Sequence, residues 1–215
     1  MKIYNFFFLF FLASCSTIDT NRIAPAYVEA FISIKQSITG IENTINPDLI
    51  SNIPYASMTV KIGKGPTGLM ILEEISEEGN VWVSADGVYL VIKNGKIIKT
   101  FGLNNNLHEI LSSHDGWKDD LYNDQQYINY FSFTDPDLKN LKVTSNYILK
   151  ETESIDLVFE SKELTLIEEH IYAEEIGWRA TNKFWIDSDN FIWKSVQHVS
   201  PKLPQFQIEV TKKPQ

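Results

Sequence analysis

The chain has 215 residues, 43% of them apolar and 22% charged, and 28 acidic against 19 basic residues give a net charge of -9. This apolar content can bury a core, which excludes a disordered or fibrous protein, and the length fits one domain. The acidic balance, with no run of basic residues, excludes a protein that depends on the phosphate backbone, so we expect no nucleic-acid partner.

The first fifteen residues have the pattern of a bacterial lipoprotein signal. Lys2 gives a positive start, residues 6–12 form an unbroken apolar run, and Leu12-Ala13-Ser14-Cys15 has the form of a lipobox. The apolar run is shorter than the roughly 20 residues that span a bilayer as a helix, so we expect a cleaved signal and no transmembrane anchor. The sequence therefore predicts a signal peptide over residues 1–14 and lipid attachment at Cys15, with a further acyl chain such as palmitate on the new N-terminus. An ordinary signal with an incidental cysteine is the alternative.

Cys15 is the only cysteine, so neither a disulfide nor a thiolate metal site can form. Apart from the covalent lipid on Cys15, the sequence predicts no cofactor. Residue 16 is Ser and not Asp, which favours sorting to the outer membrane in Gram-negative bacteria. We therefore expect a protein anchored in the outer membrane and facing the periplasm, with residues 15–24 as the lipidated tether and residues 25–215 as a single β-rich domain.

One amphipathic helix is predicted over about residues 25–43. Its apolar residues recur at spacings of three and four, which places them on one face of a helix. Such a helix either packs on the body of the same chain or binds a partner. The residues on this face are Tyr27, Val28, Phe31, Ile34, Ile38 and Ile41.

After Pro54 the chain consists of short β-type runs separated by turn signals. The clearest turns are Asp86-Gly87, Asn94-Gly95 and residues 187–190. Connections this short join antiparallel neighbours and leave no room for crossover helices. The predicted fold is all-β, mainly an antiparallel meander that forms a sandwich or a partly open barrel, with one N-terminal amphipathic helix. The predicted strands include residues 82–85, 89–93, 96–101, 127–133, 142–150, 154–160, 164–173, 178–186, 191–199 and 205–211, and residues 104–126 form one long polar interruption.

No nucleophilic catalytic set is evident in the sequence, and we expect a protein that is not an enzyme. A nucleophile must lie within hydrogen-bond reach of a base. Ser195 and His198 are three residues apart, which puts them on opposite faces of a strand. The two side chains are therefore not expected to pair.

Two histidine-containing sets keep a metal or enzyme alternative open. Glu168 and His170 share a strand face, with Glu174 beyond them, but zinc normally requires three or four well-placed ligands. In the long polar stretch, the histidines and the acid that could act as ligands or as an acid–base set are His108, His114 and Asp115. We expect both sets to be structural or solvent-facing, and the sequence predicts no metal site.

Carboxylates gather around one tight turn. Glycosidases need two carboxyls that face each other across the sugar, with one kept protonated by apolar surroundings. Charged runs along exposed strand faces meet neither condition, so we interpret this cluster as a solvated surface. The cluster consists of Glu73, Glu74, Glu77 and Glu78.

The tryptophans are candidate contacts for a glycan or a partner protein. Trp presents a flat apolar body with a polar tip, which suits stacking on sugars as well as core packing. In the hairpin closed by residues 187–190, the expected register places Trp185 opposite Ile192 and Phe184 opposite Trp193, so that both faces carry large apolar side chains. One face must be core, and the other is covered or lines a groove. The candidates are Trp82, Trp117, Trp178, Trp185 and Trp193.

Several sequence blocks together resemble the YjbF/GfcB family of group 4 capsule and exopolysaccharide lipoproteins. Besides the lipobox they are PYASM (54–58), WVSADG (82–87), NGKIIKTFGL (94–103) and residues 182–201, where NKFWID and WKSVQ are most similar to the family pattern. The resemblance covers essentially the whole mature chain. It implies an all-β periplasmic lipoprotein that acts beside a polysaccharide exporter and a tyrosine kinase or related secretion partners, and it brings no catalytic residues.

The leading hypothesis is an outer-membrane lipoprotein that serves as a non-enzymatic accessory in capsule or exopolysaccharide assembly or export. Its partners would be the membrane, through the lipid anchor, and either the glycan itself or export proteins. One alternative is a glycan-modifying enzyme that uses Glu168, His170 or the loop residues His108, His114 and Asp115. Another is a carrier of apolar ligands, whose half-open barrel would hold lipid against Trp185 and Trp193.

Overall fold

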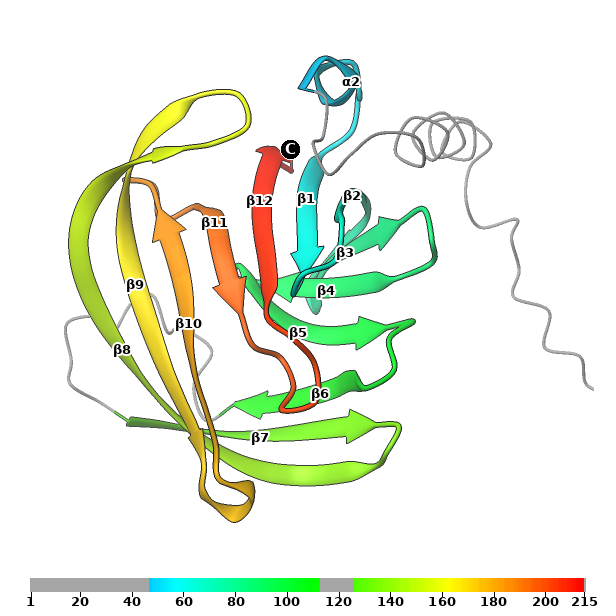
Figure 1. Cartoon of the computed structure of the whole chain (residues 1–215), viewed down its shortest axis with the longest axis vertical. Helices are drawn as coiled ribbons and strands as arrows, with labels where there is room; N and C mark the ends of the chain where they lie inside the picture. The colour runs from blue at the N-terminus through cyan, green and yellow to red at the C-terminus, as the bar shows by residue number, and fades with distance from the viewer. Residues whose placement is uncertain (1–46, 113–125, 215) are drawn as a thin grey trace, which may run out of the picture.

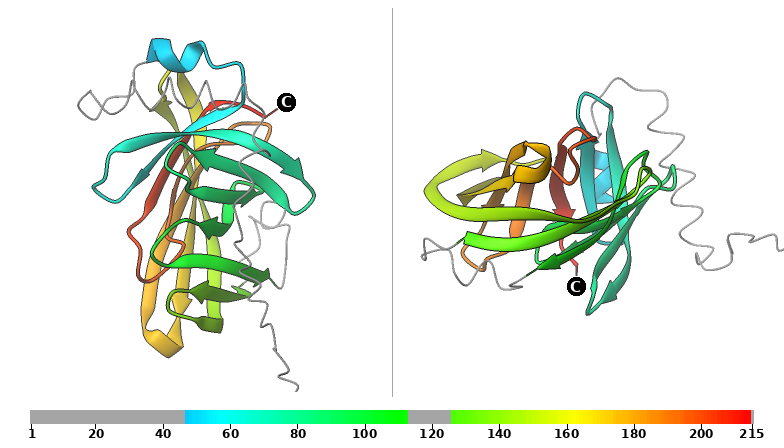
Figure 2. Two further views of the ribbon diagram at one scale, coloured as in Figure 1. Left: turned by 90° about the vertical axis from the view of Figure 1, so that its right-hand side faces the viewer. Right: turned by 90° about the horizontal axis from the view of Figure 1, so that it is seen from below.

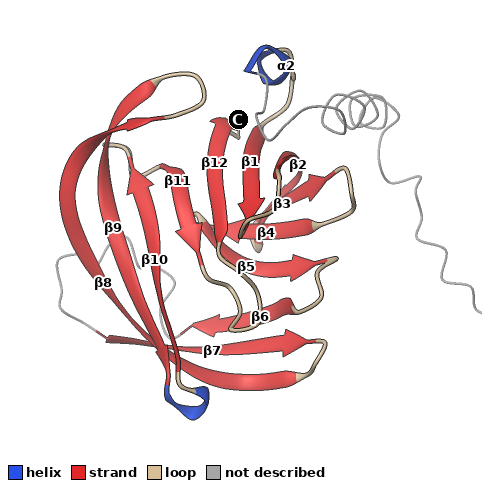
Figure 3. Cartoon of the chain, in the orientation of Figure 1, coloured by secondary structure: helices blue, strands red, loops and turns tan. Residues whose placement is uncertain are grey.

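A computed structural model describes residues 47–112 and 126–214 of the chain. It is built almost entirely of antiparallel strands (Figure 3), which confirms the predicted all-β fold. The predicted signal peptide, the tether with Cys15 and the helix over 25–43 lie outside the described residues. Within residues 47–112 and 126–214 no helix is long and apolar enough to cross a membrane. The elements are α2 (Pro47–Ser51), β1 (Ser57–Ile62), β2 (Thr67–Ser76), β3 (Gly79–Ser84), β4 (Tyr89–Lys93), β5 (Lys96–Phe101), β6 (Asn106–Ser112), β7 (Gln126–Thr134), β8 (Leu138–Asp156), β9 (Ser161–Ala173), η2 (Glu174–Ile176), β10 (Trp178–Ile186), β11 (Ile192–Gln197) and β12 (Phe206–Lys212).

All twelve strands of the described part of the chain belong to one sheet, whose order is β5-β4-β3-β2-β1-β12-β11-β10-β9-β8-β7-β6. The first and last strands pair in the middle of the sheet, with Val60 opposite Ile208. The two edge strands are therefore β5 and β6, which follow each other in the chain. They meet through a side chain, because the Leu107 backbone N–H donates to Thr100 Oγ1 at 2.9 Å. The sheet is a nearly closed barrel, and we call the junction of β5 and β6 the seam.

The sheet curls so that two groups of strands cross each other. In Figure 1, β9, β10, β12 and β1 stand upright while β4 to β7 lie across them, and Figure 2 shows the same crossing from two further sides. The long strand β8 belongs to both groups, because it pairs with β7 over residues 138–146 and with β9 over residues 144–156. Strand twist of one hand makes such curling the ordinary outcome for a large sheet.

The main hydrophobic core fills the inside of the curled sheet. It takes alternate residues from each strand, as the two-residue period of a strand requires. Burial of this surface, worth about 25 cal/mol per Å², is the main stabilising term. Its most deeply buried members include Met58, Met70, Leu90, Leu107, Leu141, Val143, Ala173 and Phe206, and a second inner cluster contains Tyr127, Tyr147, Ile167, Phe184, Ile186 and Ile192.

Three predicted turns are confirmed by their backbone geometry. Asn94 and Gly95 have φ of 51° and 80°, as the two central residues of a tight hairpin turn require. Gly87 has φ of 83° and Asn190 has φ of 60°. These turns place the β4–β5 and β10–β11 hairpins, which border the cavities described below.

Two predicted strand boundaries are wrong. The separate strands predicted over 142–150 and 154–160 are one strand, β8, which continues to Asp156. The turn follows it, where the Leu157 N–H donates to the Glu160 carbonyl at 2.9 Å. Strand β6 lies inside the stretch predicted as a polar interruption, because an edge strand with an exposed outer face tolerates polar residues such as His108 and Glu109.

The predicted register of the β10–β11 hairpin is also wrong. Trp185 pairs with Lys194 and Phe184 with Ser195, and the register shifts between Trp185 and Ile186 so that Trp193 occupies a bulge. The cause lies in the turn, where Asp187 Oδ1 accepts the backbone N–H groups of Asp189 and Phe191 at 3.0 and 2.9 Å. The longer turn leaves Phe184 inside the sheet and Trp185 on its outer face.

Candidate functional site

Two of the predicted contact residues, Trp82 and Trp193, line the same cavity. It has a volume of about 330 Å³ and lies between the β4–β5 turn and the β10–β11 turn. We call it the tryptophan cavity. It combines aromatic rings and aliphatic side chains with amide, hydroxyl and charged groups, a mixture that suits a small polar ligand with flat apolar faces. Its other lining residues are Met58, Asn80, Ile92, Asn94, Gly95, Asp189, Asn190, Phe191, Ile192, Lys194, Ser195, Ile208, Val210 and Pro214.

The ring of Trp193 is held in place from several sides. Its indole N–H donates to Asp187 Oδ2 at 2.8 Å, and the Phe191 ring meets it edge-on at a centroid distance of 5.2 Å. The ammonium groups of Lys162 and Lys213 lie 4.4 and 4.7 Å from its centroid. Partial burial disfavours the Asp187 carboxylate, but the hydrogen bonds from Trp193, Phe191 and Lys213 outweigh it and lower its pKa. These contacts fix the orientation of the Trp193 ring.

Trp178 and Trp185 lie apart from this cavity. Trp178 packs against the main core and meets the Phe131 ring at a centroid distance of 6.2 Å. Trp185 lies on the outer face of the sheet, where its indole N–H donates to Glu153 Oε1 at 2.8 Å. Trp117 lies outside the described residues.

A second cavity, of about 430 Å³, opens at the seam on the other side of the β4–β5 turn. We call it the seam cavity, and Asn94 lines both it and the tryptophan cavity. The seam cavity also carries a mixed lining of aromatic, amide and charged groups. Its residues are Glu78, Lys93, Asn94, Lys96, Ile98, Ile110, Leu111, Ser112, Tyr127, Asn129, Phe131 and Tyr147.

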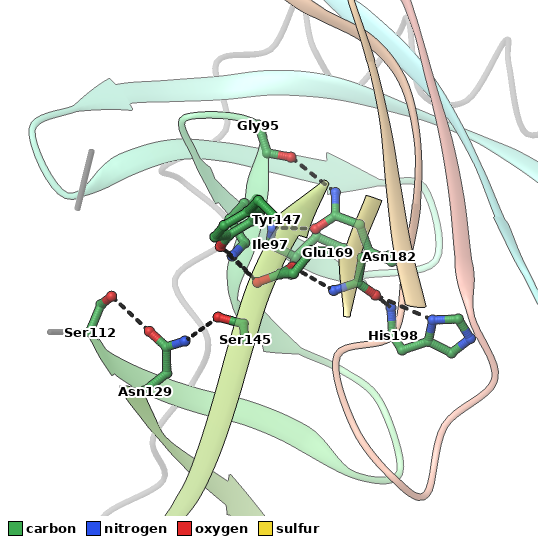
Figure 4. A network of polar contacts seen from close by, with 11 residues as sticks. Gly95, Ile97, Ser112, Asn129, Ser145, Tyr147, Glu169, Asn182 and His198 are labelled. Carbon is green, nitrogen blue, oxygen red and sulfur yellow. Dashed lines mark hydrogen bonds and ion pairs between the residues drawn. The ribbon is translucent and has the colours of Figure 1, made fainter. Parts of the chain in front are cut away.

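A buried carboxylate, Glu169, stands at the centre of a polar network inside the sheet (Figure 4), and two residues of the seam cavity bind it. Glu169 is 2% exposed, and its Oε1 accepts from Lys96 Nζ at 2.5 Å and from the Tyr147 hydroxyl at 2.8 Å. Its Oε2 accepts from Asn182 Nδ2 at 2.8 Å. Burial disfavours the charged carboxylate, but Lys96 and the other donors outweigh it, so the pKa of Glu169 lies below its ordinary value. Burial and the Glu169 charge raise the pKa of Tyr147, so its hydroxyl stays protonated.

Asn182 links Glu169 to His198, whose backbone N–H donates to Asn182 Oδ1 at 2.7 Å, and the neighbouring Gln197 makes a further set of hydrogen bonds. Gln197 Oε1 accepts the Ile97 N–H at 2.9 Å, and its Nε2 donates to the Gly95 carbonyl at 3.0 Å. The same amide donates to the Ser195 hydroxyl, which lines the tryptophan cavity, at 2.9 Å. Gln197 therefore fixes the β4–β5 turn, and with it the wall between the two cavities. The hydrogen bonds to the Gly95 carbonyl and the Ile97 N–H are drawn in Figure 4.

Two groups of this network make the folded state less stable in acid. The pKa of His198 lies below its ordinary 6.5 because burial disfavours the charged ring, and the pKa of Glu169 lies below 4.5. In both cases the unfolded chain takes up the proton at higher pH than the folded one. The stabilising contributions are therefore complete above the unfolded pKa and are lost as the pH falls through the folded pKa.

We expect the melting temperature to fall first below about pH 6.5, through His198, and more steeply below about pH 4.5, through Glu169. Thermal unfolding followed by circular dichroism across this range measures both declines. His198→Asn should abolish the first decline, whereas His108→Asn, at an exposed position of β6, should leave it unchanged. A wild-type melting temperature that stays constant down to about pH 5 would contradict the assignment.

The histidine sets of the enzyme alternative lie away from both cavities where they are described. Glu168 and His170 do share the outer face of β9, with 3.5 Å between Glu168 Oε2 and His170 Nε2, but Lys150 and Lys183 also surround Glu168. These cations lower the pKa of Glu168 against the opposing effect of its desolvation. His108 is exposed on β6, and His114 and Asp115 lie outside the described residues. In residues 47–112 and 126–214 no cluster of three potential metal ligands occurs.

Ser195 and His198 make different contacts, in agreement with the expectation that they do not pair. The Ser195 hydroxyl accepts from Gln197, while the His198 ring contacts Asn182 Oδ1 at 3.2 Å. The carboxylates predicted as a solvated surface are exposed around the β2–β3 turn, and Glu78 also reaches the seam cavity.

No motif in the sequence singles out Glu169, Lys96 or Asn182. The alternation of residues along the strand does, however, predict that Glu169 faces the core. Ile167 and Ile171 are core residues of β9, and Glu169 has the same parity. An acidic residue on the core face of a strand requires a partner, because an unpaired buried charge is costly. The partner itself, Lys96, is 73 residues away and only the fold reveals it.

Comparisons with known proteins agree with this fold. Residues 29–211 match the model of the family described as "Group 4 capsule polysaccharide lipoprotein gfcB, YjbF". The chain is 26% identical to the uncharacterized lipoprotein GfcB of Escherichia coli (strain K12), over 84% of this chain and 83% of that protein. It is 24% identical to the lipoprotein YjbF of the same organism, over 72% of this chain and 74% of that protein.

A solved structure has the same fold. The crystal structure of the hypothetical lipoprotein YmcC from Escherichia coli (K12) superposes with a TM-score of 0.69 at 21% identity, over 86% of this chain and 96% of that one. The family match, the two relatives and the shared fold all extend over most of the chain. It therefore belongs to the YjbF/GfcB family of group 4 capsule polysaccharide lipoproteins.

Proposed function

We propose that this protein is a non-enzymatic accessory in capsule or exopolysaccharide assembly or export, and that it binds the polysaccharide directly. Lipid on Cys15 would hold it on the periplasmic face of the outer membrane, beside export proteins. The glycan would occupy the tryptophan cavity and the neighbouring seam cavity, which the β4–β5 turn separates.

The convergence of Trp82 and Trp193 on one cavity carries this proposal. Both are candidate sugar contacts by residue type, they come from strands far apart in the chain, and the fold brings them together beside amides and a carboxylate. Aromatic faces bind the apolar faces of sugar rings, and amides and carboxylates bind their hydroxyls. The buried network around Glu169 keeps the walls of both cavities rigid, which lowers the entropy lost on binding.

Removal of the Trp193 ring is expected to weaken polysaccharide binding about tenfold or more, since loss of an aromatic anchor costs on the order of 1.5 to 3 kcal/mol. The full-length lipoprotein in detergent would be titrated calorimetrically with fragments of the polysaccharide from its own organism. Trp185→Ala is the matched control, because Trp185 has the same chemistry but lies on the outer face of the neighbouring strand. Equal affinity of Trp193→Ala and wild type, with both folded, would remove the glycan from this cavity.

The role in export would be tested in cells lacking the gene, by measuring the amount and chain length of surface polysaccharide. Wild-type protein should restore both. Glu168→Gln, His170→Asn and His108→Asn should restore them equally well, because these side chains lie away from both cavities. Loss of complementation by one of these folded variants would favour the enzyme alternative. An unchanged surface polysaccharide in the deletion strain would remove the export role itself.

A third cavity supports the apolar-carrier alternative at a different place from the one expected. It measures about 380 Å³ and lies between the β1–β2 and β3–β4 turns. Its lining is mostly apolar, and neither Trp185 nor Trp193 contributes to it. Mass spectrometry of organic extracts of the purified protein distinguishes the two functions, since a carrier would release a noncovalent lipid. The lining residues are Val60, Ile62, Gly65, Pro66, Thr67, Gly68, Leu69, Met70, Ser84, Ala85, Asp86, Val88, Leu90 and Phe206.

A further inference from the structure

The indole nitrogen of Trp82 is a buried hydrogen-bond donor with no acceptor among the described residues. Trp82 is 3% exposed and lies on β3 between Leu72 of β2 and Leu90 of β4. The indole N–H can only donate. Leaving such a donor unpaired in the folded state costs about 1 to 3 kcal/mol. The nitrogen has almost no exposed area, so an acceptor from outside the chain reaches it only when the ring turns toward the adjoining cavity, and it would then bind favourably.

The surroundings of Trp82 restrict the chemistry of that acceptor. Aliphatic side chains from four strands line the same cavity, among them Met58, Ile92, Ile192 and Ile208. A hydroxyl or a water molecule brings donors of its own, and a buried water needs two to four polar partners. The nearby hydroxyl of Ser195 already accepts from Gln197. A carbonyl oxygen attached to a methyl group suits the Trp82 N–H better than a hydroxyl or a water molecule does. It accepts a hydrogen bond without donating one, and its methyl group packs on aliphatic side chains.

We propose that the tryptophan cavity binds an acetyl group carried by a sugar, with the Trp82 indole N–H donating to the acetyl carbonyl oxygen. The inference rests on the proposed glycan-binding function and adds the substituent that is recognised. The sugar ring that bears the acetyl group then meets Trp193 and the polar side chains of the same cavity. Trp82 thus acts as the specificity-determining residue, and Trp193 supplies affinity for the sugar ring.

Two neutral trisaccharides with the same linkage test this directly. Chitotriose carries N-acetyl groups where cellotriose carries hydroxyls. We expect the full-length lipoprotein in detergent to bind chitotriose at least about tenfold more tightly by calorimetry, which corresponds to about one well-made hydrogen bond. Trp82→Phe keeps an aromatic ring but removes the donor, together with part of the indole ring. It should lower chitotriose affinity to that of cellotriose.

The wild-type comparison tests the acetyl preference even if Trp82→Phe fails to fold. Equal binding of the two trisaccharides, or a preference that survives in folded Trp82→Phe, overturns the inference. Mild alkali, which removes O-acetyl esters but not N-acetyl amides, applied to fragments of the organism's own polysaccharide identifies which acetyl linkage is bound. Fragments that bind with no acetyl preference leave the glycan function standing and refute only the role of Trp82. Absence of binding by the fragments and by both trisaccharides refutes the glycan function as well as the role of Trp82.

Discussion

Lys96→Met is expected to destabilise the protein by about 3 to 5 kcal/mol, among the largest effects of any single substitution in this chain. Lys96 Nζ lies 2.5 Å from Glu169 Oε1, and the Glu169 side chain is only 3% exposed. Without the ammonium, the carboxylate keeps Tyr147 and Asn182 as donors but loses its neutralising charge in a buried position. The pKa of Glu169 should then rise, so the variant should lose less stability on acidification than the wild type does. Urea unfolding at neutral and mildly acidic pH measures both effects.

A double-mutant cycle separates the charge from the packing. Glu169→Gln keeps the shape of the side chain and leaves Lys96, whose side chain is 21% exposed, with access to water, so its cost should be smaller. The double variant Lys96→Met/Glu169→Gln removes both charges, and it should be more stable than Lys96→Met alone. Additive losses from the two single substitutions would show that the ion pair does not couple and that Lys96 acts only through packing.

The strands and most turns of this fold follow from local sequence patterns, because hairpins are encoded within a few residues. Asn94-Gly95 and Asp86-Gly87 specify turns that only residues tolerant of positive φ can occupy. The closure of the sheet does not follow in this way. The pairing of β1 with β12 joins residues about 150 positions apart, and nothing local distinguishes it from other strand pairs. The sequence also gives no sign of the open seam. There the consecutive strands β5 and β6 form no ladder of backbone hydrogen bonds.

Only the aromatic residues of the candidate site could be predicted from the sequence. Residue type alone marks Trp82 and Trp193 as candidates, but it marks Trp185 equally. A one-residue bulge at Trp193, next to the turn that Asp187 holds, decides which of the two hairpin tryptophans reaches the cavity. The polar part depends on contacts of long sequence separation, such as Lys96 with Glu169 and Ile97 with Gln197. Pairing of this kind is set by how the sheet curls, which no short motif encodes.

The β4–β5 turn separates the two cavities, and its Gly95 fits against Ile192 with no room for a side chain. A Cβ added at Gly95 would lie 2.0 Å from Ile192 Cδ1 and 3.0 Å from Cγ1, and Ile192 is itself buried in the second inner cluster. Gly95 also has φ of 80°, which L residues with a side chain adopt at a cost. The turn cannot move away freely, because Gln197 holds the Gly95 carbonyl at 3.0 Å. Both steric and conformational terms therefore act at this one position.

Gly95→Ala is accordingly expected to destabilise the protein by about 2 to 5 kcal/mol, of which about 1 to 2 kcal/mol comes from the positive φ and the rest from overpacking. Gly87→Ala is the matched control, because Gly87 has φ of 83° but nothing within 4 Å of its added Cβ, so only the conformational term remains. Adding Ile192→Val to Gly95→Ala removes the atom that clashes, and the double variant should be more stable than Gly95→Ala alone even though Ile192→Val by itself destabilises. Urea unfolding of the four variants measures these differences. Equal losses of stability in Gly95→Ala and Gly87→Ala would mean that the β4–β5 turn does not press on β11. The rigid wall that we assign to the two cavities would then have no support.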